Sequence, residues 1–221
     1  QWEALTPPID EEMRSWLKWG FALKQLPKEA AGHYRRTHKG ALENESEMEQ
    51  QMLKKLRSGA WAGTAPDRVK SITPLNLVPK SGGKGWRLVQ DCRQQNRFIQ
   101  PWRCRLETLA SAAHITIQKD DILWCLDFYS GFEALLFEPS TALWFAAQYT
   151  ASPQMVDVML KEGLVKPECV SPPRKGRHTI TVVPRAMCQG MALGPAVFSK
   201  LTRSFVRSFR ARGVRLISYL D

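Results

Sequence analysis

The sequence predicts an α+β fold, in which helices and strands mix without regular alternation. Three observations support this class. Two amphipathic helical patterns precede a β-hairpin pattern with a glycine-rich tip. Short apolar runs typical of strands follow in the middle of the chain, and a long helical stripe lies near its C-terminal end. No internal repeat or low-complexity segment interrupts this order.

Composition and charge narrow the classes of protein. The 221 residues suffice for one domain or two intimately packed ones. With 43% hydrophobic and 24% charged residues, the composition is that of a globular protein and excludes a disordered chain or a fibre. A formal net charge of +11 indicates a polyanionic partner, most commonly nucleic acid, although basic ribosomal and membrane-surface proteins share this trait.

The cysteines and histidines give no metal or disulfide pattern. The five cysteines lack a CxxC pair and a histidine at zinc-ligand spacing, so we expect reduced core residues. His33 and His38 have no acidic or thiol neighbour in sequence, which favours a solvated stretch. The cysteines are Cys92, Cys104, Cys125, Cys169 and Cys188.

The chain carries no targeting or membrane signal. No apolar run approaches the roughly 20 residues of a membrane span, and no signal-peptide core is present at the N-terminus. We therefore expect an intracellular protein without a membrane partner. The chain starts with Gln1 and stops on a charge directly after an apolar run, so both ends look cut.

The N-terminal third predicts two helices. From Asp10 to residue 26, apolar residues recur at helical spacing, and Asp10 followed by two glutamates is typical of an N-terminal cap. Residues 28–51 are mostly charged or polar and indicate a solvated face. A second amphipathic helix over residues 48–56 is ended by Gly59.

A β-hairpin is expected between residues 72 and 89. Two apolar runs, residues 75–78 and 86–89, flank the turn-rich segment 79–85. Two lysines and three glycines in that segment predict a flexible, basic tip.

The middle of the chain predicts further strands. Residues 122–126 form a continuous apolar run that leads into Asp127, as expected of a strand buried on both faces that delivers a carboxylate at its end. Residues 143–149 and 180–183 are further strand candidates. Prolines and a basic cluster between residues 150 and 178 indicate a surface excursion with one short helix at residues 155–160.

The C-terminal part predicts a helix and then a strand. Gly194-Pro195 opens the helix, because proline suits the first helical position, and Gly213 ends it. An apolar stripe follows one face: Val197, Phe198, Leu201, Phe205, Val206 and Phe209. The other face is basic: Lys200, Arg203, Arg207 and Arg210. Residues 214–220 alternate as a strand toward Asp221.

Two aspartates at the ends of two strands could hold divalent cations if the strands lie side by side. The alternative is a pair of strand-end caps or turn residues, and the spacing of Asp127 and Asp221 alone favours that alternative. The order and content of four segments change the balance. They are LNLVPKSGGKGWRLVQDCRQQN (75–96), CLDFYSGF (125–132), CQGMALGPAVF (188–198) and SYLD (218–221).

Together these segments resemble the reverse transcriptases of retroviruses and retrotransposons, over residues from about 52 to 221. The residues before the hairpin and at the end lean toward retrotransposon enzymes of the DIRS type. The resemblance implies the fingers and palm of a right-hand polymerase, with an antiparallel palm sheet packed on helices and the thumb absent. Residues 1–60 would be a helical N-terminal extension leading into the fingers. Residues 61–221 would be fingers and palm, truncated at the second metal-binding turn.

One interval departs from the retroviral pattern. Asp127 and Gln189 are 189 − 127 = 62 positions apart, which is longer than in that pattern. The resemblance therefore implies an insertion near residues 150–175.

The resemblance also implies roles toward the incoming nucleotide. Lys80 and Arg87 match positions that contact its triphosphate, and their chemistry suits phosphate oxygens. Phe132 matches the aromatic gate against the ribose 2′-hydroxyl, although core packing explains it equally well by periodicity. Gln189 would lie against the nucleotide.

Further positions match residues beside the template and primer. Gly190 would allow close approach of template or base, as glycine does where backbone passes near a ligand. Asp91, Arg93 and Asn96 match motif positions read as template-side or structural support. The basic face of the C-terminal helix, with Lys200 and Arg203, fits beside a nucleic-acid backbone.

The implied reaction is addition of deoxynucleotides to a primer 3′-hydroxyl on an RNA or DNA template. Asp127 and Asp221 would hold two magnesium ions, with manganese as a substitute, because oxygen ligands suit these cations. Since the chain ends at Asp221, we expect the 221 residues alone to be inactive.

Two alternatives to a retroelement reverse transcriptase stay open. A decayed or co-opted palm could act only as a nucleic-acid-binding or assembly module. An RNA-directed RNA polymerase shares the palm and metals but has no need of an aromatic gate at Phe132. The sequence carries no signal for the oligomeric state.

Overall fold

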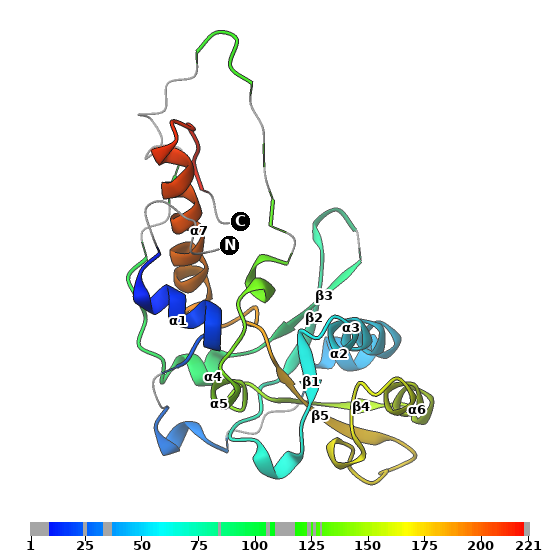
Figure 1. Cartoon of the computed structure of the whole chain (residues 1–221). Coiled ribbons are helices and arrows are strands. Elements are labelled where there is room, and N and C mark those ends of the chain that lie inside the picture. Colours follow the sequence, from blue (N-terminus) through cyan, green and yellow to red (C-terminus); the bar gives the residue numbers. More distant parts are fainter. Residues whose placement is uncertain are drawn as a thin grey trace.

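The structure, a computed structural model shown in Figure 1, describes residues 9–23, 26–32, 37–83, 85–104, 107–108, 118–122, 125, 127–128 and 130–218. Helices and antiparallel sheets are mixed along the chain, which confirms the α+β class. The strands are β1 (Trp61–Gly63), β2 (Leu75–Pro79), β3 (Trp86–Gln90), β4 (Ala147–Ala151) and β5 (His178–Pro184). The α-helices are α1 (Glu11–Trp19), α2 (Lys39–Glu43), α3 (Glu45–Arg57), α4 (Arg93–Asn96), α5 (Pro139–Ala142), α6 (Pro153–Lys161) and α7 (Gly194–Ala211). The 3-10 helices are η2 (Lys28–Ala30), η3 (Pro66–Arg68), η4 (Ser81–Gly83), η5 (Gly131–Ala134) and η6 (Pro167–Cys169).

The strands form two antiparallel sheets. The order in the larger one is β1-β5-β4, and β2 and β3 form the hairpin that the sequence predicts. Leu77 and Leu88 are register partners on its buried side, while Val78 and Arg87 are partners on the other side. The Lys80 amide donates to the Gly85 carbonyl at 2.8 Å and closes the strand end.

Two hydrophobic clusters hold these elements together. One joins α1, α5 and α7 around the fully buried Phe21 and Phe145. The other packs α2, α3 and α6 against all five strands around Met52 and Ile180. In Figure 1 the first group of helices lies to the left of the larger sheet and the second to its right.

Residues 152–177 connect β4 to β5 and pack on α3 and β1. The prediction of a short helix here is confirmed by α6. The Arg57 guanidinium at the end of α3 donates to the Glu162 carboxylate at 2.8 Å and 2.5 Å. Gly63 of β1 lies so close to Cys169 that a Cβ there would be 2.9 Å from the Cys169 sulfur. The segment is therefore anchored on α3 and β1.

The first predicted helix is shorter than expected. Asp10 caps α1 by accepting from the Met13 amide at 2.8 Å, as predicted. The helix ends at Trp19 because the next residue, Gly20 (φ +91°), passes directly against the backbone of residues 137–138. Phe21 then forms a parallel bridge with Phe137 instead of continuing the helical stripe.

The helix predicted after Gly194-Pro195 is confirmed as α7, and its predicted apolar stripe faces the core. Val197, Phe198, Leu201 and Val206 are buried, whereas Phe209 is 41% exposed. Gly213, with φ +81°, follows the last turn as predicted.

The two strands predicted to deliver Asp127 and Asp221 are wrong in the described residues. Residues 122 and 125 are outside any strand, and Ile122 is 88% exposed. Residues 214–218 also form no strand, and residues 219–221 lie outside the described part. A strand needs a hydrogen-bonded neighbour, and neither run has one among the described residues. The strand expected at 143–149 starts only at Ala147, because α5 and a turn precede it.

The cysteine prediction is confirmed for three of the five. Cys92, Cys169 and Cys188 are buried and free. Cys104 is half-buried and Cys125 is exposed, so the core prediction is wrong for Cys125, which follows an unpaired rather than a buried run. Within the described residues, no helix has the length and apolar character needed to cross a membrane.

Candidate active site

Segments 91–96, 127–132 and 189–194 meet around the first turn of α7. Asn96 joins the first and third of them. Its side-chain amide donates to the Gly190 carbonyl at 2.9 Å, and its side-chain oxygen accepts from the Ala192 amide at 2.9 Å. Because both polar ends of one side chain are used, the segment that carries Gln189 is fixed against α4.

A buried contact lies beneath this junction. The sulfurs of Cys92 and Cys188 are 3.7 Å apart, and the hydrogen bond to Cys188 raises the pKa of Cys92, as does burial. Both effects keep the thiol protonated and inert. Gly190 (φ +109°) comes so close that a Cβ there would be 2.2 Å from the Gln90 carbonyl oxygen. Gln189 itself is exposed.

The segment with Asp127 reaches α7 through aromatic contacts. The rings of Phe128 and Phe132 lie 5.8 Å and 5.4 Å from the ring of Phe198. Phe132 is half-buried and packs on Gly194, which supports the core-packing interpretation without testing the gate. Asp127 is exposed next to these rings. Glu133 forms an ion pair with Lys55, which ties this segment to α3.

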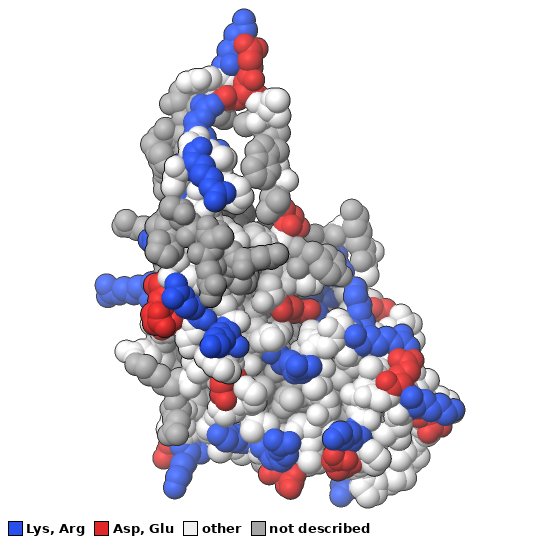
Figure 2. All heavy atoms as spheres, in the orientation of Figure 1, with Lys and Arg blue, Asp and Glu red and all other residues white. Residues whose placement is uncertain are grey.

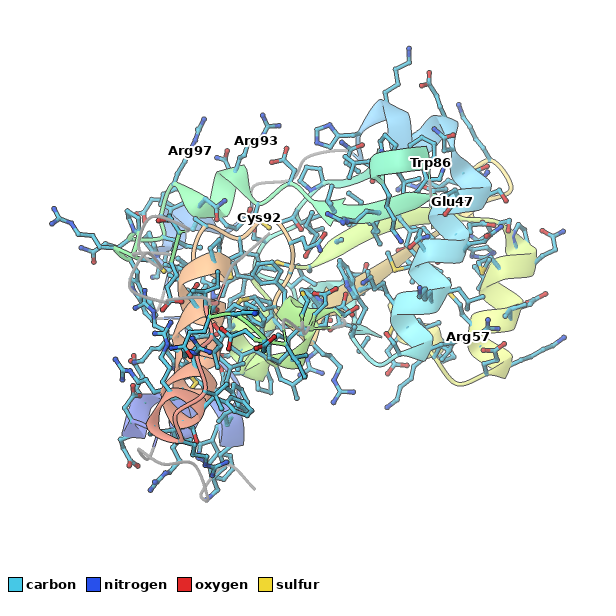
Figure 3. The ribbon with its side chains drawn as sticks, turned by 90° about the horizontal axis from the view of Figure 1, so that it is seen from above. Glu47, Arg57, Trp86, Cys92, Arg93 and Arg97 are labelled. Carbon is cyan, nitrogen blue, oxygen red and sulfur yellow. The ribbon has the colours of Figure 1, made fainter. Side chains whose placement is uncertain are left out.

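Asp91 is the centre of a small polar network. Its carboxylate accepts from the Arg93 guanidinium at 2.7 Å and 2.6 Å and contacts the His38 ring at 3.1 Å. The expectation of a merely solvated His38 is wrong, because the acidic partner comes from a distant part of the sequence. The side chain of Asp91 is 10% exposed and that of Arg93 is 73% exposed. In Figure 3, Arg93 and Arg97 both project outward from α4.

The network predicts an acid-sensitive contribution to stability. The Arg93 guanidinium, with help from His38 and against partial burial, holds the pKa of Asp91 well below its usual range. A depressed folded-state pKa stabilises the fold above the unfolded-state value near 3.8, and this contribution is lost as the pH falls further. We expect Asp91→Asn to lower the free energy of unfolding by about 1 kcal/mol at pH 7.

Urea denaturation of both chains at pH 7 and at pH 3 measures this effect. The difference between them should shrink in acid, and the exposed Asp157→Asn serves as the control. A difference that grows as the pH falls would contradict the assignment.

The hairpin presents Lys80 and Arg87 on one face. Arg87 pairs in register with Val78, and Lys80 follows two residues after Val78, so strand alternation places both cations opposite the buried Leu77 and Leu88. Both side chains are exposed. β3 runs directly into Asp91, so this face and the junction at α4 are continuous in the chain. No described contact joins Lys80 or Arg87 to Asp127 or Gln189.

Lys200 and Arg203 do not join this site. Lys200 contacts Asp10 at 3.4 Å, pairs with Glu12, and lies 5.1 Å from the Trp16 ring centre. Residues on a helix are about 100° apart, so Lys200 and Arg203 point away from the Phe198 side of α7. The structure therefore separates them from Asp127, Phe132 and Gln189.

Asp127 has the donor chemistry for a divalent cation. Carboxylate oxygens are the preferred ligands of magnesium. The described residues contain no group of three or more His, Cys, Asp or Glu that could hold a metal ion. Asp221, the second expected ligand, lies outside the described residues, so the structure does not test the pair.

Sequence reasoning did not single out Arg97. It lies four residues after Arg93, directly after the last residue of α4, and is exposed. The i, i+4 spacing in RQQNR is the signal that could have found it. Arg93 and Arg97 together form a basic edge beside the junction with segment 189–194.

Comparisons with known proteins identify the fold. The structure of the native protease-reverse transcriptase of prototype foamy virus matches with a TM-score of 0.57 over 91% of this chain, at 16% sequence identity. The chain has the fold of reverse transcriptase fingers and palm. A selenomethionine-labelled mutant of the same foamy virus enzyme matches with a TM-score of 0.54 over 85% of the chain at 17% identity. A foamy viral protease-reverse transcriptase in complex with double-stranded DNA matches with a TM-score of 0.54 over 93% of the chain at 15% identity.

This reverse transcriptase fold covers only part of the matched proteins. The chain spans 22%, 20% and 28% of the lengths of these three chains. No family model and no curated protein sequence matches. The matches are viral enzymes and lend no support to the DIRS type, which stays a prediction.

Proposed function

We propose that this chain is the fingers and palm of an RNA-directed DNA polymerase of a retroelement. The observation that carries the proposal is the convergence of segments 91–96, 127–132 and 189–194 at the start of α7, within a reverse transcriptase fold. Template, primer and deoxynucleoside triphosphates are the proposed partners. The full activity is proposed for a protein that contains these residues, since the chain spans 22% of the foamy virus chain.

Magnesium is the proposed cofactor, with Asp127 and Asp221 as its ligands. The support is chemical: Asp127 is an exposed carboxylate next to the packed ring of Phe128. Two magnesium ions at this place would activate the primer hydroxyl and neutralise charge on the leaving pyrophosphate. The described residues would then provide positioning, with Asn96 holding segment 189–192 in place.

The nucleotide would lie between the hairpin face and the junction. Lys80 offers a mobile point charge and Arg87 a planar fork, and both are exposed on the same face. Gln189 is exposed on the segment that Asn96 fixes. Gly190 leaves no room for a side chain near Gln90, so it would keep the backbone low beneath a base.

The experiment that tests the proposal is primer extension on an RNA template with deoxynucleotides or ribonucleotides, with and without Phe132→Ala. We expect extension with deoxynucleotides by the unmodified protein. Removing the ring should admit ribonucleotides, with discrimination falling by about tenfold or more, since steric exclusion of one hydroxyl accounts for a few kcal/mol.

Phe132→Tyr is the matched control, because it keeps the ring and its packing on Gly194 and should preserve discrimination. Unchanged discrimination in a folded Phe132→Ala protein would remove the gate role. Binding of nucleic acid without any extension would favour the co-opted module. Extension with ribonucleotides by the unmodified protein would favour an RNA-directed RNA polymerase.

A further inference from the structure

A pocket of about 230 Å³ lies between α7 and residues 102–104, away from the candidate active site. Its lining is strongly basic for its size. Four cations and one carboxylate surround it: Arg103, Lys200, Arg203, Arg207 and Asp10. Trp102 completes the wall.

The pocket and the candidate active site lie on opposite sides of α7. Phe198 and Phe205 contact Phe128 from one side of the helix. At about 100° per residue, the stripe that contains Lys200, Arg203 and Arg207 is centred about half a turn away from these phenylalanines. A ligand in the pocket therefore contacts a surface separate from Asp127.

The basic charge in the pocket is only partly neutralised. Lys200 is held by Asp10 and Glu12, which offset its charge. Arg103 and Arg207 are exposed, and no described ion pair involves either of them. Their guanidinium groups are suited to phosphate oxygens, which they can bind through two parallel hydrogen bonds. Charge is not gathered in one patch elsewhere: on the face in Figure 2, basic side chains are spread out with acidic ones among them.

Trp102 adds an aromatic surface beside these cations. One side of its ring stacks on Trp16, with centres 5.6 Å apart and planes 20° apart, and the residue is 41% exposed. A fixed and exposed indole next to arginines is the combination with which proteins bind single strands, since bases stack on the ring and cations bind the backbone.

We propose that this pocket binds a single-stranded nucleic acid, with a phosphate between Arg103, Arg203 and Arg207 and a base on Trp102. The pocket is smaller than the roughly 300 to 1,000 Å³ that enclose whole small ligands. Its size and the exposure of Trp102 and Arg103 therefore fit one unit of a polymer rather than an enclosed free nucleotide. The proposal does not rest on polymerase activity.

The test is fluorescence anisotropy of a labelled oligothymidylate with the 221-residue chain over a range of salt concentrations. Arg103→Ala/Arg207→Ala should raise Kd at least fivefold at low salt. It should also lower the slope of log K against log salt by about 1.4, because each phosphate contact contributes about 0.7 on single strands. The charge-matched control is Lys166→Ala/Arg174→Ala, whose exposed residues lie on the β4–β5 connection far from α7 (Figure 1).

Trp102 is tested separately from charge. Trp102→Ala should weaken binding about fivefold or more without changing the salt slope, and Trp102→Tyr should restore most of the affinity. Equal losses in the two double variants would show a general charge effect and overturn the proposal. Displacement of the strand by adenosine triphosphate at equal phosphate concentration would assign the pocket to free nucleotides and also overturn it.

Discussion

Replacement of Asp127 by asparagine is expected to lower primer extension by about a thousandfold or more in a protein that contains this chain. The carboxylate is the proposed magnesium ligand, and an amide loses the charge that holds the cation and offsets charge in the transition state. A thousandfold corresponds to about 4 kcal/mol of activation free energy. The measurement is the single-turnover rate of nucleotide addition.

The same substitution should leave folding unchanged, because Asp127 is exposed and no described hydrogen bond involves its side chain. Thermal unfolding of the two chains checks this. Asp157→Asn, an exposed aspartate on α6, is the matched control for loss of one surface charge and should extend primers normally. An Asp127→Asn protein that extends primers at the normal rate would contradict the metal-ligand role.

Gly190→Ala is expected to lower the free energy of unfolding by about 3 kcal/mol. An alanine at φ +109° is strained by about 1 to 2 kcal/mol, and its Cβ would lie 2.2 Å from the Gln90 carbonyl oxygen. Relief of this clash requires segment 189–192 to move away from Asn96, which breaks two hydrogen bonds. Urea denaturation at neutral pH measures the loss.

Gly163→Ala is the matched control, since Gly163 also has a positive φ of +68° but nothing lies within 4 Å of an added Cβ. It should cost only about 1 kcal/mol. Equal losses at the two positions would show that backbone strain alone matters at Gly190. In that case the close approach of segments 90–92 and 188–190 would have no energetic importance.

Elements whose cause is local could be predicted from the sequence. The hairpin of β2 and β3 follows from alternation around a glycine-rich turn, and α7 follows from its stripe between Gly194-Pro195 and Gly213. The cap at Asp10 is equally local.

Features that depend on distant partners could not be predicted. The run at residues 122–126 has the composition of a strand, but composition does not supply the neighbour that a strand needs. His38 finds Asp91 and Asn96 finds Gly190 only through the fold. The basic face of α7 was visible in the sequence, but Trp102 and Arg103 reach it from a segment about a hundred residues earlier, so the pocket was not.

The most direct test of the proposed polymerase is single-nucleotide addition on RNA templates that differ in one base. A primer end-labelled and annealed to each template is incubated with magnesium and one deoxynucleotide at a time. The account predicts that only the deoxynucleotide complementary to the varied base is added, at a rate that Asp127→Asn abolishes. Addition that ignores the template base, or no addition by a folded protein that contains this chain, would contradict it.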